Sequence, residues 1–228
     1  SGNIDLDVTL THPGQGKWQI QDLVVTTNDG GAMPVHFPYR VDRIKGKLNQ
    51  QDNDTLKLDF FGMAGNRPVT ARGFVRHPGP ASQIDITLEI EQVPIDSALL
   101  SASPEGIKSV LNQIDLHGKA DAVLKLTREP MLNQPIHLDF LAKMDHGALQ
   151  YRDFPYRISD LSGRVFYSSK TGKTSFDQLK GTHGNARLSA SGSYARFEKD
   201  GKLNLSIIAE NAACDSNLRL ALPQSLQE

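Results

Sequence analysis

The chain has 228 residues, enough for one large domain or two of about 110 residues, and either could bury a sizeable core. Its 25 Lys and Arg residues balance 26 Asp and Glu residues with the signs interspersed, which argues against a nucleic-acid-binding surface or an acidic tail. A single cysteine, Cys214, excludes an internal disulfide framework and a multi-cysteine metal site. Frequent turn formers, 19 Gly and 12 Pro, favour a β-rich fold.

Alternation of apolar and more polar residues predicts strands over residues 4–10, 84–90, 120–126 and 136–142. Turn-forming residues separate the strands, and the spacing is too short for helical crossovers, so an antiparallel meander is expected. The first of these strands carries Ile4, Leu6, Val8 and Leu10 on one face. We expect a lipid groove or a closed core to be lined by Ile84, Ile86, Leu88, Ile90, Ala120, Ala122, Leu124, Leu126, Ile136, Leu138, Phe140 and Ala142.

One amphipathic helix is predicted over residues 103–115. Ser103 is a suitable N-cap and Pro104 suits the first helical position. Before this helix, Pro94 should end a strand and Asp96 should cap a short helical turn. The helical spacing then gives one apolar stripe, which is expected to lie on the apolar face of the sheet. The stripe consists of Ile107, Val110, Leu111 and Ile114.

The tetrapeptide FPYR occurs twice and marks an internal repeat. FPYRVDRIKGKL (37–48) matches FPYRISDLSGRV (154–165) with five identities, and Gly2 corresponds to Gly118. The hydrophilic stretches 49–54 and 168–173 then absorb two residues, as hairpin loops tolerate. Beyond them the offset is constant at 119 residues for Gly65-Asn66 with Gly184-Asn185, Gly73 with Gly192, Asp96-Ser97 with Asp215-Ser216, and Pro104 with Pro223.

We therefore predict a mainly β protein of two tandem units, residues 1–117 and 118–228. Each unit should be an antiparallel, curved sheet of about six strands, followed by one or two short helices that pack on the sheet. The second helix looks truncated, so we expect the sequence to be an excerpt of a longer protein. The segments GMAGNRP (62–68) and GTHGNAR (181–187) share their Gly-x-x-Gly-Asn spacing and are predicted to be hairpins rather than anion sites.

No catalytic or metal-binding constellation is evident. None of the seven histidines has H-x-x-x-H spacing or a cysteine neighbour. Asp145-His146 has no accompanying nucleophile elbow, and Gly172-Lys173-Thr174 has Tyr167 where a phosphate loop needs its first glycine. Trp18 is expected to pack in a strand. We expect no enzyme activity, no cofactor and no metal.

The arrangement of these pieces resembles the AsmA-like family of envelope proteins, which includes the TamB group. The motif P-Y-x-[IV]-x-x-[IL]-x-G occurs at 38–46 and 155–163, and G-x-[VY] occurs at 73–75 and 192–194. An Asp-Ser-x-Leu segment and a proline follow the last strand of the first unit, and Asp215-Ser216 and Pro223 follow that of the second. The resemblance covers nearly the whole chain, once per unit.

The resemblance implies a curved β-groove that is apolar inside, in periplasmic proteins anchored in the inner membrane that move phospholipid or maintain the outer membrane. The expected partner is then phospholipid or another acyl lipid, with the membrane reached through other parts of the parent chain. Two points stay open. The helix at 103–115 could plug the groove, and the protein could instead be a scaffolding or binding module that recognises protein or glycan through loops 49–54 and 168–174.

Overall fold

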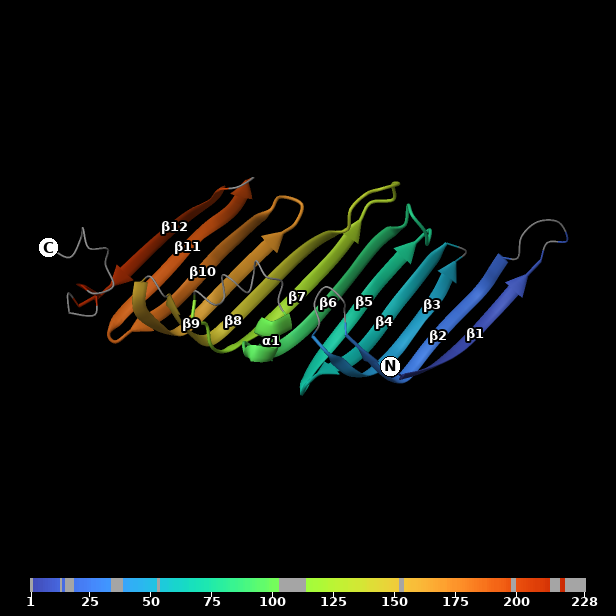
Figure 1. Ribbon diagram of the computed structural model, residues 1–228, viewed down its shortest axis with the longest axis horizontal. Coiled ribbons are helices and arrows are strands. Elements are labelled where there is room, and N and C mark those ends of the chain that lie inside the picture. The colour runs from blue at the N-terminus through green and yellow to red at the C-terminus, as the bar shows by residue number, and fades with distance from the viewer. Residues whose placement is uncertain are drawn as a thin grey trace. The chain divides into compact units, whose positions relative to one another are not determined.

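The computed structural model describes residues 2–12, 14, 19–33, 39–52, 54–102, 114–151, 154–197, 200–213 and 218–219. The fold is mainly β, as predicted: in the described part of the chain, twelve strands form one sheet in which neighbours in the chain are neighbours in space (Figure 1). In chain order they are β1 (Gly2–Thr11), β2 (Gln19–Ala32), β3 (Val41–Asp52), β4 (Thr55–Ala64), β5 (Arg67–Arg76), β6 (Gln83–Pro94), β7 (Lys119–Arg128), β8 (His137–Tyr151), β9 (Phe154–Ser168), β10 (Lys173–His183), β11 (Ala186–Phe197) and β12 (Asp200–Glu210).

The strand order corrects the predicted layout of two sheets, because β6 and β7 are also hydrogen-bonded neighbours. Clustering of the chain gives two compact units, residues 1–91 with 123–139 and residues 92–122 with 140–228. This division cuts through β6, β7 and β8. The predicted boundary between residues 117 and 118 separates two sequence repeats rather than two compact units, and it stays a prediction.

Helices are few in the described part of the chain. The helix α1 (Ser97–Ala102) follows β6, and the described residues do not support the prediction that helices pack on the sheet. Most of the predicted helix, residues 103–113, lies outside the described residues. Its end was predicted wrongly, because Asp115 exchanges two backbone hydrogen bonds with Gln150 instead of continuing a helix. No helix among the described residues is long and apolar enough to cross a membrane.

The start of α1 confirms the predicted cap. The ladder of β6 ends at Pro94, and the Asp96 carboxylate accepts hydrogen bonds from the backbone N–H groups of Ala98 and Leu99, each at 3.0 Å. These are donors that the first turn of a helix leaves unsatisfied. Local turn chemistry therefore decides where this strand gives way to a helix.

Both predicted hairpins are confirmed. Gly65-Asn66 joins β4 to β5, Gly184-Asn185 joins β10 to β11, and the residues on either side of each dipeptide are paired. Gly65 and Gly184 have φ of 59° and 56°, the positive values that type II′ turns require at their first central residue. The loop between β3 and β4 has two residues and that between β9 and β10 has four, so the change of offset falls in a hairpin loop.

Unusual backbone geometry recurs at matching positions in the two halves. Arg43 and Asp160, 117 residues apart, have φ of 52° and 50° next to irregularities in strand register. Gln92, two residues before the end of β6, and Asn211, directly after β12, are 119 residues apart and have φ of 52° and 56°. Positive φ is uncommon for residues other than glycine.

One close approach between strands recurs as well. A Cβ atom added to Gly73 on β5 would lie 2.0 Å from the carbonyl oxygen of Asp85 on β6. A Cβ atom added to Gly192 on β11 would lie 2.2 Å from that of Asn204 on β12. Only glycine therefore fits at these two crossings, which are 119 residues apart in the sequence.

Candidate functional site: the apolar faces of the sheet

The register of β1 to β6 produces one continuous apolar face. Directly paired residues of antiparallel strands share a face, so the pairings can be followed from strand to strand. We call the resulting surface of the first compact unit the first apolar face. Its rows are Leu6, Val25, Leu48, Leu58, Gly73 and Ile86; Ile4, Thr27, Gly46, Phe60, Ala71 and Leu88; and Leu56, Val75 and Ile84.

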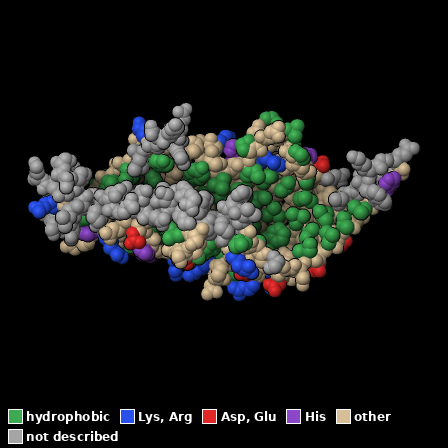
Figure 2. Space-filling model, in the orientation of Figure 1, with side chains coloured by type: hydrophobic (Ala, Val, Ile, Leu, Met, Phe, Trp, Pro, Cys, Tyr) green, Lys and Arg blue, Asp and Glu red, His purple; other side chains and the backbone are tan. Residues whose placement is uncertain are grey.

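The first apolar face is only partly covered. Leu58 is buried, but Ile4 and Leu6 on β1 remain 66% and 60% exposed. None of the large side chains in the described part of the chain falls below 2% exposure. Figure 2 shows hydrophobic side chains gathered over β1 to β5. Contiguous exposed apolar surface of this kind is typical of a lipid, ligand or protein contact site.

A second apolar face runs across β9 to β12 in the other compact unit. Its rows are Val165, Phe176, Gly192 and Leu205; Leu179, Ala190 and Ile207; and Leu161, Gly181, Leu188 and Ala209, in which flanking pairings supply the members where the register shifts. Leu161 is buried, whereas Leu205 and Ile207 on β12 are exposed. As on β1 in the first apolar face, the most exposed side chains of the second apolar face lie on the last strand of the sheet, β12.

The predicted lining residues of β6 and β7 lie on strands, as expected. Ile84, Ile86, Leu88 and Ile90 are half-buried members of the first apolar face on β6. On β7, Ala120 is buried, and Ala122, Leu124 and Leu126 are half-buried. Lys125 forms an ion pair of 3.3 Å with Asp85, on the polar face of β6. Because side chains alternate along a strand, Leu124 and Leu126 lie on the apolar side.

The prediction for the next strand needs one correction. Leu138, Phe140 and Ala142 lie half-buried on β8, but the strand begins at His137, and Ile136 before it is 51% exposed. Pro135 has no N–H to donate to a ladder, so pairing starts only after it. Ile136 therefore belongs to the connection from β7 to β8 rather than to a strand face.

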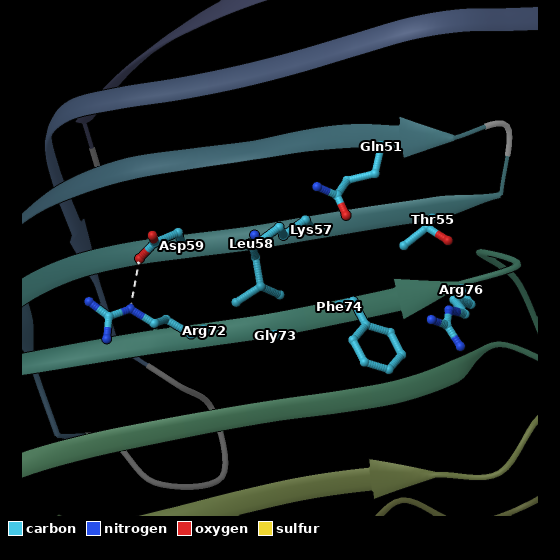
Figure 3. A pocket seen from close by; sticks show the side chains of 9 residues that line it. All are labelled: Gln51, Thr55, Lys57, Leu58, Asp59, Arg72, Gly73, Phe74 and Arg76. Carbon is cyan, nitrogen blue, oxygen red and sulfur yellow. Dashed lines mark hydrogen bonds and ion pairs between the residues drawn. The ribbon is translucent and has the colours of Figure 1, made fainter.

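The opposite face of β3 to β5 carries charges and a shallow depression of about 300 Å³ (Figure 3). Arg72 and Asp59 form an ion pair of 3.1 Å, and the Arg76 guanidinium lies 4.6 Å from the centre of the Phe74 ring. A backbone hydrogen bond from Asp54 is the main cause that lowers the pKa of Asp52. The depression is lined by Gln51, Thr55, Lys57, Leu58, Asp59, Arg72, Gly73, Phe74 and Arg76.

Two side-chain contacts were not anticipated from the sequence. His146 Nδ1 lies 2.6 Å from Asp160, which raises the pKa of His146, and no serine takes part. Tyr156 of the second FPYR is buried and stacks on His183, with the ring centres 3.7 Å apart. For the His146–Asp160 contact, the only signal in the sequence was the repeat, in which Asp160 aligns with Arg43 and His146 aligns with Asp29. The described residues hold no group of three side chains suited to a metal ion.

The chain was compared with protein-family models, curated proteins and solved structures, and none of the three comparisons gave a match. Functional inference therefore starts from the two apolar faces and the charged depression.

Proposed function

We propose that the chain is a non-enzymatic segment of an AsmA-like envelope protein that carries lipid along an apolar β-groove. Its role would be lipid transport or outer-membrane homeostasis, in the periplasm or cell envelope, with the parent protein anchored in the inner membrane. The cargo would be phospholipid or another acyl lipid. The observation that carries the proposal is the first apolar face, which continues across six strands, half-buried over most of them and exposed at Ile4 and Leu6 on β1.

The physics of such a role is partition. An acyl chain on the first apolar face would exchange water for side chains such as Leu48, Phe60 and Leu88, with a gain of about 25 cal/mol per Å² buried. Six strands spaced at about 4.8 Å offer about 24 Å along the ladder. Contacts of this type have no fixed direction, so the acyl chain can slide while its polar head group stays in water.

Tandem repetition of the unit is part of the proposal. Its support is the recurrence of positive φ at Arg43 with Asp160 and at Gln92 with Asn211, and of the close crossings at Gly73 and Gly192. Repetition would extend an apolar face without requiring new local geometry. In the proposed form the face is open to lipid, whereas a plug formed by the predicted helix at 103–115 would exclude it.

Native mass spectrometry of the purified chain tests lipid binding. We expect phospholipid adducts on the wild-type chain, and their loss in Leu88→Asp, which places a charge on the first apolar face. The matched control is Thr87→Asp, the neighbouring residue, which shares the opposite face with Arg72. A folded wild-type chain that stays free of lipid after incubation with phospholipid vesicles would contradict the proposal, as would equal loss in both variants.

A second variant covers the case in which Leu88→Asp fails to fold. Leu6 belongs to the same face but is already 60% exposed, so Leu6→Asp should fold normally by circular dichroism. It should also reduce the transfer of fluorescent phospholipid between vesicles. Unchanged transfer by folded Leu6→Asp would exclude β1 from the lipid path.

One observation favours the alternative of a binding module. The charged depression includes Gln51, Thr55 and Arg76. The predicted recognition loop 49–54 is shorter than expected, because residues 49–52, Gln51 among them, belong to β3. The donors of the depression suit the hydroxyls or anionic groups of a glycan. If this alternative holds, Arg76→Ala should abolish glycan-array binding while Leu88→Asp leaves it intact. The lipid proposal predicts no glycan binding by either variant or the wild-type chain.

A further inference from the structure

The connection between β7 and β8, residues 129–136, carries exposed apolar side chains, and we call it the apolar loop. Met131, Leu132 and Ile136 are 57%, 66% and 51% exposed. Figure 2 shows hydrophobic side chains gathered in the region where Figure 1 places this connection. The connections β3–β4 and β9–β10 are instead polar, with the sequences Asn-Asp and Ser-Lys-Thr-Gly. Such polar and small residues are usual in turns that face water, so the apolar loop indicates a contact site.

The backbone of the apolar loop suits an apolar medium. Pro130 and Pro135 have no N–H, and the N–H of Met131 donates to the carbonyl oxygen of Glu129 at 2.8 Å. A backbone donor without a partner is costly to remove from water, so the small number of free donors lowers the cost of insertion. Glu129, at the first position, is the only charged residue of the apolar loop.

The base of the apolar loop is fixed by a neighbouring hairpin. Arg128, the last residue of β7, donates to the carbonyl oxygens of Ser82 and Gly79 in the connection from β5 to β6. Beyond this anchor, Asn133 has a φ of 60°, a turn conformation that asparagine tolerates. The apolar side chains are therefore presented on a turn with a held base, which lowers the entropy that a contact would cost.

Apolar strand residues lie next to the apolar loop. Leu126, near the end of β7, and Leu138, near the start of β8, are both half-buried, and Leu126 is on the apolar side of its strand. The apolar loop and both leucines belong to the first compact unit, which also carries the first apolar face. An acyl chain that left a bilayer at the apolar loop would meet these leucines next.

We propose that the apolar loop inserts Met131, Leu132 and Ile136 into the surface of a phospholipid bilayer. A bilayer is the indicated partner because eight residues are too few for a stable protein interface, which takes about 20–30 residues on each side. A few apolar side chains suffice for reversible insertion at a lipid surface. The choice of lipid also rests on the proposed function, since a lipid carrier must meet the bilayer that supplies its cargo.

Flotation of the purified chain with phosphatidylcholine vesicles tests the insertion. We expect the wild-type chain to float with the vesicles at low and high salt, because the apolar loop has no cationic residue. Leu132→Asp should bind at least about tenfold more weakly, and Leu132→Trp should retain binding. Leu132 is largely exposed, so both variants should fold normally by circular dichroism.

The matched control is Met33→Asp. Met33 is 60% exposed and follows β2, at the opposite end of the strands from the apolar loop, because successive connections of a meander alternate between the two ends. Met33→Asp should float like the wild-type chain. A wild-type chain that stays in the buffer, binding that is lost at high salt, or equal weakening in Met33→Asp and Leu132→Asp would overturn the proposal.

Native mass spectrometry with monomeric lysophospholipid separates this inference from lipid carriage, because no bilayer is present. Leu132→Asp should retain the adducts of the wild-type chain, which the first apolar face would hold. Adducts on a wild-type chain that does not float would overturn membrane insertion and leave lipid carriage in place. Flotation that depends on Leu132, without any adducts, would support membrane insertion and contradict lipid carriage.

Discussion

The polar faces of the two halves differ although their backbones share the same devices. On β3 to β5 the polar face is ionic, with Lys47, Asp59 and Arg72 in successive paired positions. The aligned positions on β9 to β11 hold Arg164, Gln178 and Ser191, so only one of these three is charged. The positive-φ positions and glycine crossings, in contrast, recur. The features that repeat are those that the backbone needs for strand pairing, whereas the solvent-exposed side chains differ between the two halves.

One pair of positions reverses its charge between the halves. Asp29 and Arg43 in the first half align with His146 and Asp160 in the second. Only the second set forms a close side-chain contact, at 2.6 Å, while Arg43 donates to the carbonyl oxygen of Gly65 at 3.3 Å. At Arg43 and Asp160, the shared positive φ therefore holds a base in the first half and an acid in the second.

The largest expected effect concerns the glycine crossings. Gly73→Ala should lower the free energy of unfolding by about 3 kcal/mol or more, because the added Cβ meets a carbonyl oxygen at 2.0 Å and φ is 153°. Gly192→Ala meets the same obstacle at 2.2 Å without a positive φ and should cost less. Urea unfolding measures both.

Gly79→Ala is the control for these variants. Gly79 has a φ of 151°, but an added Cβ would have only one neighbour, at 4.0 Å. Gly79→Ala therefore measures the energetic cost of a positive φ at a non-glycine residue without a steric clash. If Gly192→Ala proves as harmless as an ordinary surface change, the two crossings are not equivalent.

A medium effect is expected at the loop from β5 to β6. Arg128 on β7 donates through Nε to the carbonyl oxygen of Ser82 at 2.7 Å and through Nη2 to that of Gly79 at 3.1 Å, and it also contacts the Ser82 hydroxyl. Ser82 is buried, so Arg128→Lys, which loses the planar fork, should cost about 2 kcal/mol.

Arg164 serves as an exposed comparison, because its ion pair with Asp177 is open to solvent. Arg164→Lys should change stability by less than about 1 kcal/mol in the same thermal or urea measurement. Equal losses of stability in Arg128→Lys and Arg164→Lys would mean that the burial of Ser82 does not determine how much the Arg128 contacts stabilise the fold.

The smallest effect is the titration of His146. Its hydrogen bond with Asp160 raises its pKa above 6.5 in the folded chain, so the contribution to stability is full below that value and is lost as pH rises through the raised pKa. NMR should show this raised pKa, and Asp160→Asn should lower it. Asp29→Asn, the matched change in the first half, should leave it unaltered.

Much of the local structure could be predicted because its causes are local. The Gly65-Asn66 turn and the Asp96 cap depend on residues within a few positions of each other, and they are as predicted. The apolar alternation on β6 gave a strand and its two faces. At Ile136, the same alternation extended one residue too far because periodicity ignores the missing N–H of Pro135.

Sequence alone determined that the chain is mainly β, where its hairpins turn, and that its segments correspond at fixed offsets, because turn chemistry and side-chain period are local properties. Tertiary structure decided that β6 pairs with β7, that Gly73 and Gly192 mark close crossings, and that His146 meets Asp160. Those outcomes depend on the register between strands, which is set by many weak contacts acting together and is not written in any one segment.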